Sequence, residues 1–271
     1  MACLDRSHCC MDNTKHSSIL YNILRNQEQE GAHCRDQQEE DTGHVQGCPC
    51  SSSQRKATLK SPQVACKAAC AVLVKTLKFV SNVSCFQELP LEDQLLLVRK
   101  CWAPLLVLGL AQDRVDFETV ETLEPSMLQR ILTHGQQELQ PPKAQLQKLQ
   151  YQLPAASEIR GIKSFLIMCW SLDISTKEYA YLKGTVLFNP DLAGLLCVKY
   201  IEGLQREARQ ALNEHVGTIH RWDRSRVAKL NVLLSLLRSI NASAVAELFF
   251  RPIIGSVNME DMLLEMLCSK F

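Results

Sequence analysis

The sequence lacks the short motifs that mark the common enzyme classes. It contains no G-x-S-x-G nucleophile turn, no phosphate-binding P-loop and no G-x-G-x-x-G dinucleotide fingerprint. The histidines in the part of the chain expected to fold, His134, His215 and His220, belong to no recognisable catalytic motif. We therefore expect no catalytic residues, no cofactor and no enzymatic activity.

Zinc-binding cysteine pairs are also missing. None of the 13 cysteines shows the C-x2-C spacing of zinc modules; Cys9 and Cys10 are adjacent, and Cys48 and Cys50 form C-x-C. We interpret the cysteines as free thiols, and we expect no metal and no direct sequence-specific DNA binding. A net charge of +1 gives no general attraction to a polyanion, and we interpret the basic stretch 221–229 as a solvated helix start.

Long hydrophobic segments are scarce. No apolar run reaches the roughly 18 residues that span a bilayer, because charged residues such as Arg99, Lys100 and Asp113 interrupt the richest stretches. The first residues carry no hydrophobic signal core. We therefore expect no membrane association.

What remains is an ordinary globular composition with a polar start. Hydrophobic residues make up 46% and charged residues 22% of the chain. Residues 1–60 combine polar runs with little that could form a core, so we expect a disordered N-terminal arm. Ser61-Pro62 is typical of a helix start, with Ser as the N-cap and Pro as the first helical residue. The folded domain is therefore expected over 61–271.

The periodicity of that domain predicts an all-α fold. Apolar residues recur at three- and four-residue steps over 64–83, 91–110, 159–172, 176–188, 192–212 and 226–240. Only residues 115–120 alternate apolar with polar, which predicts a small β-ribbon. Residues 136–154 are rich in Gln and Pro and predict a loop.

Leucine motifs are the features of the sequence that point to a binding function. Leucines at i, i+3 and i+4 share one helix face, which suits capture of the helix by an apolar groove. The literal L-x-x-L-L pattern occurs at 192–196, 230–234 and 233–237, where we expect folded core helices. The near-match Leu20, Ile23 and Leu24 instead lies in the polar arm and has no core to join. It is our candidate for a partner-binding leucine box.

The C-terminal segment predicts a short amphipathic helix. Its apolar residues at 262, 263, 266 and 267 form one stripe, and an acid stands beside it. The helix is either the last core helix or a detachable switch helix. The candidate switch residues are Met262, Leu263, Leu264, Glu265, Met266 and Leu267.

Several segments, in this order along the chain, resemble nuclear-receptor ligand-binding domains. The stretches 78–80, 86–98 and 101–108 are similar to the signature of the family's third to fifth helices, 183–191 to the end of its eighth helix, and 247–255 to the segment before its switch helix. The phrases Leu110-Ala111-Gln112-Asp113 and 249–255 further resemble the orphan subfamily that lacks a DNA-binding domain. The resemblance covers about 62–271 and implies a three-layer helical sandwich.

The resemblance also implies which surfaces act. The arm's leucine box is similar to the box through which this subfamily docks on other receptors. The turn Cys85, Phe86, Leu89 and Pro90 is implied to be either an internal staple or a repressor helix set against a partner's groove. The domain's own coactivator groove would include Lys78, Ser81 and Gln94, and Ser81 occupies the position where the family carries a lysine that acts together with the acid at Glu265.

The implied function is that of a transcriptional corepressor in the nucleus and cytoplasm. It would bind DNA-bound nuclear receptors and corepressors, as a homodimer or heterodimer, and block coactivator recruitment. The alternative is a ligand-regulated receptor that recruits cofactors through its own switch helix. Many steroid receptors carry an arginine four residues after the glycine of the fifth helix, whereas this chain has Asp113 four residues after Gly109 and Arg114 one place further.

Overall fold

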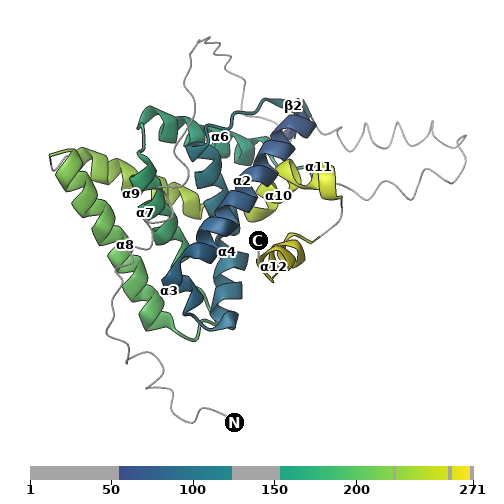
Figure 1. Ribbon diagram of the computed structural model, residues 1–271. Helices are drawn as coiled ribbons and strands as arrows, with labels where there is room; N and C mark the ends of the chain where they lie inside the picture. Colours follow the sequence, from purple (N-terminus) through teal and green to yellow (C-terminus); the bar gives the residue numbers. More distant parts are fainter. Residues whose placement is uncertain (1–54, 124–152, 222–223, 256–257, 269–271) are drawn as a thin grey trace, which may run out of the picture.

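The computed structural model describes residues 55–123, 153–221, 224–255 and 258–268 (Figure 1). The predicted leucine box and most of the predicted loop lie outside these residues. Helices dominate the described part and pack around the long helix α4 (Leu91–Gln112). The predicted all-α, three-layer fold is confirmed.

Helix α4 is the central element of the fold. It contacts α2 (Pro62–Asn82), α6 (Ala156–Ser171), α7 (Thr176–Leu187), α9 (Arg224–Arg238) and α10 (Ala242–Phe249). An 18-residue window of α4 reaches a mean hydropathy of 1.5, so the expectation that no segment is apolar enough to span a membrane was wrong for this helix. The two charges inside that window, Arg99 and Lys100, are too few to offset its leucines. Two thirds of that window is buried, as expected for a core helix.

Helix α2 lies directly against α4 (Figure 1). Pro62 is its first residue and Ser61 its N-cap, as predicted, although the Ser61 side chain makes no capping hydrogen bond. The two helices are in tight contact at Gly109. A Cβ atom there would stand 2.6 Å from Val72 Cγ1 and 3.1 Å from Thr76 Oγ1, so only glycine fits this contact.

A small antiparallel ribbon closes one end of the domain. Strand β1 (Arg55–Leu59) pairs with β2 (Thr119–Leu123), with Ala57 opposite Glu121. The ribbon was predicted over 115–120, so its second strand begins four residues later than expected. The expectation of a disordered arm over residues 1–60 was wrong for its last residues, because strand β1 is part of the folded domain and buries Ala57 and Leu59.

The later helices match their predicted ranges with one exception. Helix α8 (Val198–Ile219) begins six residues after the predicted start at 192 and ends seven residues after the predicted end at 212. The L-x-x-L-L motif at 192–196 therefore lies in a loop and not in a core helix, and Leu196 is 61% exposed. The loop is fixed by the buried Asp93 carboxylate, which accepts from the N–H groups of Leu196 and Cys197 at 2.7 and 2.9 Å. The two motifs in α9 are core residues in part: Leu230, Leu233 and Leu237 are buried as expected, whereas Leu234 is half-buried and Leu236 is 37% exposed.

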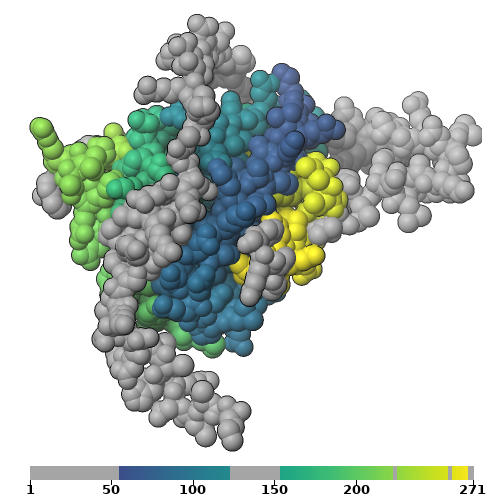
Figure 2. Space-filling model, in the orientation of Figure 1, coloured from purple at the N-terminus to yellow at the C-terminus, as the bar shows by residue number. Residues whose placement is uncertain are grey.

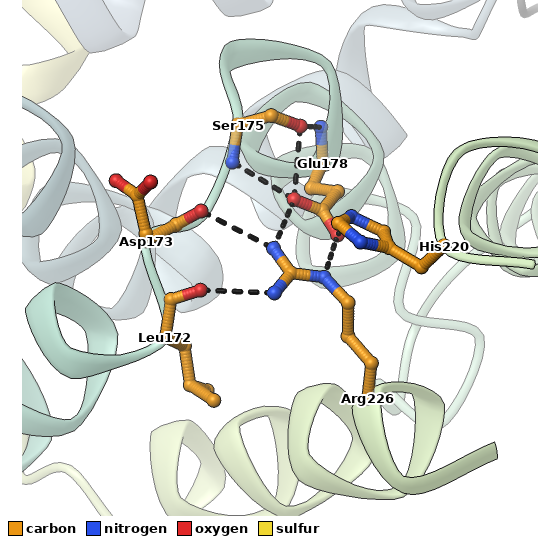
Figure 3. A network of polar contacts seen from close by, with 6 residues as sticks. All are labelled: Leu172, Asp173, Ser175, Glu178, His220 and Arg226. Carbon is orange, nitrogen blue, oxygen red and sulfur yellow. Dashed lines mark hydrogen bonds and ion pairs between the residues drawn. The ribbon is translucent and has the colours of Figure 1, made fainter. Parts of the chain in front are cut away.

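A buried polar network joins α7 and α9 (Figure 3). Arg226 Nε and Nη2 donate to the two carboxylate oxygens of Glu178 at 2.6 and 2.7 Å, and Arg226 also donates to the carbonyls of Leu172 and Asp173. Ser175 caps α7 and bonds the same carboxylate. The side chain of Arg226 is only 13% exposed. The interpretation of 221–229 as a solvated helix start was therefore wrong for Arg226.

Candidate functional site

The C-terminal helix α12 (Met259–Cys268) lies against α2 and α4 (Figures 1 and 2). Leu263 is fully buried, and the other three residues of the predicted stripe, Met262, Met266 and Leu267, are half-buried against the core. Leu264 is also half-buried, whereas Glu265 is exposed. The stripe is therefore confirmed as the packed face of this helix, and the acid is exposed beside it.

The first turns of α4, a helix that contacts α12, carry further apolar side chains. Leu91, Gln94, Leu95 and Val98 share one side of α4 through their i, i+3, i+4 and i+7 spacing. Val98 is buried, Leu95 is half-buried and Leu91 is 62% exposed. Sequence reasoning missed Leu91, although a leucine at the first position of a helix, on the same side as Gln94, was a usable signal.

The end of α2 is connected to this surface through two glutamine amides. Gln94 Nε2 donates to the carbonyls of Leu89 and Gln87 at 2.8 and 3.2 Å, and Gln87 Nε2 donates to the carbonyl of Ser81 at 2.6 Å. Lys78 is exposed one helical turn before Ser81, which is half-buried. The structure thus brings the predicted groove residues Lys78, Ser81 and Gln94 to neighbouring elements. We call Lys78, Ser81, Leu91, Gln94, Leu95 and the exposed side of α12 the switch-helix face.

The predicted repressor turn is short helix α3 (Ser84–Gln87) and the residues that follow it. Cys85, Phe86 and Leu89 are buried, and Pro90 is half-buried. Burial raises the pKa of the Cys85 thiol to about 12, so this cysteine is a neutral core side chain. The interpretation of Phe86 and Leu89 as internal staples is confirmed by their burial, and in this conformation the turn offers neither ring nor leucine to a partner.

Large side chains fill the interior next to α12. Trp102 packs edge-to-face on Phe250 with ring centroids 6.0 Å apart, and Phe117 does so on Phe249 at 5.0 Å. A cavity of about 280 Å³ borders the start of α12 and is lined by Trp102, Phe250 and polar groups of α10 and α11 (Arg251–Ile254). The first residues of α12, Met259 and Glu260, therefore share this cavity with Trp102 and Phe250.

The residues at the family's ligand-anchor position are directed to other partners. Asp113 accepts from Lys75 Nζ at 3.1 Å, and Arg114 pairs with Asp173 at 3.6 Å with 67% of its side chain exposed. Neither of them is a buried group of the interior. Among the described residues, no group of three or more His, Cys, Asp or Glu side chains is placed to hold a metal ion.

Comparison with known proteins gives one family. A family model described as the ligand-binding domain of nuclear hormone receptor matches residues 53–253. The chain is 55% identical over 276 residues to nuclear receptor subfamily 0 group B member 1 of Sus scrofa. This alignment covers 97% of the chain and 58% of the relative. The same protein is 57% identical in Homo sapiens, over 81% of the chain and 49% of the relative. In Rattus norvegicus it is 48% identical, over 100% of the chain and 59% of the relative. The chain thus spans between about half and three fifths of the length of these relatives.

Proposed function

The chain belongs to the family of nuclear hormone receptor ligand-binding domains, and on that premise we propose that it is a transcriptional corepressor. Its family consists of transcription regulators and implies a nuclear location. The corepressor would bind DNA-bound nuclear receptors through the leucine box Leu20, Ile23 and Leu24 and through its receptor-like domain. Binding would then keep coactivators from those receptors in the nucleus, and the protein would also be present in the cytoplasm.

The proposal is supported by the charge clamp that the family resemblance implies on the switch-helix face, because this chain carries only half of it. The exposed carbonyls at the end of a bound peptide helix are stabilised by a cation, and its exposed N–H groups by an acid. Glu265 provides the acid from α12, but the corresponding position on α2 is Ser81. A domain with half a clamp holds coactivator peptides weakly, which favours repression over coactivator recruitment.

The ligand-regulated alternative has less support. An anionic or carbonyl ligand needs a buried cationic anchor, whereas Arg114 is exposed and pairs with Asp173. Native mass spectrometry distinguishes the two functions, because a stoichiometric bound lipid would favour the ligand-regulated receptor.

The leucine box gives the first test. We expect the double variant Leu20→Ala/Leu24→Ala to bind partner receptor domains at least tenfold more weakly, with an unchanged thermal melt. Two buried leucines contribute several kcal/mol of gross contact energy, of which a tenfold loss requires only about 1.4 kcal/mol. Isothermal titration against a panel of receptor ligand-binding domains measures the change.

The matched control for the box is Leu4→Ala, which removes a leucine of the same arm outside the box. It should leave affinity unchanged. Equal affinity of the double variant and the wild type would remove the arm from the mechanism. Failure of the wild-type chain to displace a coactivator peptide from any receptor of the panel would overturn the corepressor function itself.

The clamp gives a second test. We expect Ser81→Lys to strengthen binding of a coactivator leucine-box peptide about two- to fivefold, because a cation at a helix C-terminus contributes about 0.3 to 1 kcal/mol. Adding Glu265→Gln should abolish that gain. Fluorescence anisotropy of a labelled peptide gives both affinities.

The control for the clamp is Asn82→Lys, which adds the same charge to the exposed neighbour, about 100° around α2. It should change the affinity much less than Ser81→Lys. An equal gain from both variants would show general charge attraction and would contradict the clamp.

A further inference from the structure

A second cavity, of about 340 Å³, lies between α4, the end of α7, α8 and α9. None of its lining residues belongs to the switch-helix face. Its volume is at the lower end of the range of small-ligand sites, roughly 300 to 1,000 Å³. The cavity can therefore hold a small molecule or a single modified side chain.

Three cations from three different helices line this cavity. Lys100 comes from α4, Arg209 from α8 and Arg238 from the last turn of α9, and all three side chains are exposed. None of them forms a hydrogen bond or ion pair within the described part of the chain. Asp191 is the single carboxylate among the lining residues, so the cavity carries a formal charge of about +2. Such a charge excess favours a dianion.

The floor of the cavity is apolar. Cys101 and Leu237 are buried, Leu234 is half-buried, and Pro104 lies beside them in α4. Burial raises the pKa of the Cys101 thiol to about 12, so the floor adds no negative charge to oppose an anion. A ligand that fits both parts of the cavity has a charged end at the rim and an apolar end at the floor.

We propose that this cavity binds a phosphomonoester attached to a small apolar group. A phosphoryl dianion would neutralise the net charge of the lining, whereas a carboxylate would leave one positive charge uncompensated. Arginine guanidinium groups match phosphate oxygens in bidentate geometry, and lysine adds a point charge. The shared chemistry has two sources, a free organic phosphate and a phosphorylated side chain of another protein.

Phenyl phosphate is the probe that tests this site, added to the full chain and followed by isothermal titration and by protein NMR. We expect saturable binding of one molecule per chain. Inorganic phosphate should bind at least tenfold more weakly, because it leaves the floor empty. Equal affinity for the two probes would overturn the proposal, since the floor would then contribute nothing.

The decisive variant is Lys100→Gln/Arg209→Gln/Arg238→Gln, with Lys67→Gln/Arg206→Gln/Lys229→Gln as the matched control. The control removes the same charge from exposed cations that do not line the cavity. We expect at least a tenfold loss of phenyl phosphate affinity in the first triple variant and less than a twofold loss in the control. Similar losses in both would overturn the proposal, because they would show attraction by net charge alone.

Two further measurements keep the result interpretable. Circular dichroism melts confirm that the variants remain folded, and the single variant Arg209→Gln should show an intermediate loss of affinity, which a folding defect would not produce. A phosphotyrosine peptide distinguishes the sources. Tighter binding than phenyl phosphate supports a protein-borne group, and weaker binding supports a free organic phosphate.

Discussion

Replacing Arg226 with leucine is expected to lower the free energy of unfolding by about 3 to 5 kcal/mol, the cost of removing one partner from a buried ion pair. Glu178 is fully buried and receives both guanidinium hydrogen bonds (Figure 3). The variant keeps this carboxylate buried and removes its counter-charge, and it also leaves the carbonyls of Leu172 and Asp173 without their donor. Urea unfolding at neutral pH measures the loss.

The same pair predicts a pH dependence with a defined sign. Burial by itself would raise the pKa of Glu178, but the hydrogen bonds from Arg226 and Ser175 outweigh it and lower the pKa below its ordinary value of 4.5. The pair therefore stabilises the fold above that pH, and the stabilisation is lost as pH falls through the lowered pKa. In the variant, burial prevails and raises the pKa of Glu178. The loss in free energy of unfolding of the Arg226→Leu variant, relative to the wild type, should be largest near neutral pH and shrink as the pH falls toward about 4.

Two controls isolate the charge effect. Arg206→Leu removes an exposed arginine of α8 and should change the free energy of unfolding by no more than about 0.5 kcal/mol. Replacing both partners, Glu178→Leu with Arg226→Leu, should recover part of the loss because no unpaired buried charge remains. A deficit that is independent of pH, and as large in the double variant, would contradict an electrostatic role.

The second large effect is expected at the α3 turn. Phe86→Ala should cost about 3 to 5 kcal/mol of stability, the range for truncating a buried aromatic ring, because Phe86 is 1% exposed. Chemical unfolding of the variant measures this loss directly. If the ring instead turned outward to a partner, the variant would melt like the wild type and lose receptor binding.

Leu91→Ala provides the contrast to Phe86→Ala. Leu91 is 62% exposed on the switch-helix face, so its truncation should change the free energy of unfolding by no more than about 0.5 kcal/mol. It should nevertheless weaken binding of a leucine-box peptide. Together the two variants separate the residue that holds the turn from the residue that meets a partner.

The helices could be predicted from the sequence because their apolar periodicity is local. The stripe of α12 and the starts of α2 and α4 follow from residues within a few turns of one another. The start of α8 could not be placed, because Asp93 fixes the preceding loop from more than 100 residues away. Strand β1 was missed for the same reason, since its pairing partner lies beyond three helices, α2, α3 and α4.

The candidate functional residues also divide into those that are local in sequence, which could be predicted, and those that only the fold brings together, which could not. The acid and the apolar stripe of α12 were visible in a ten-residue segment. The pairing of Arg226 with Glu178 spans 48 residues, and sequence spacing alone gave no reason to join them. The cations of the second cavity come from three helices and become a group only when those helices pack.

The close approach at Gly109 makes three positions of this domain interdependent. Adding one methyl group at 109 forces Val72 to give way, so a larger residue there is tolerated only together with a smaller one at 72 or 76. Each change made alone is destabilising. A larger residue at 109 overpacks the contact, and a smaller residue at 72 or 76 leaves a cavity. Related sequences that pass between the two solutions must cross a less stable intermediate, and these three positions should therefore vary as a set.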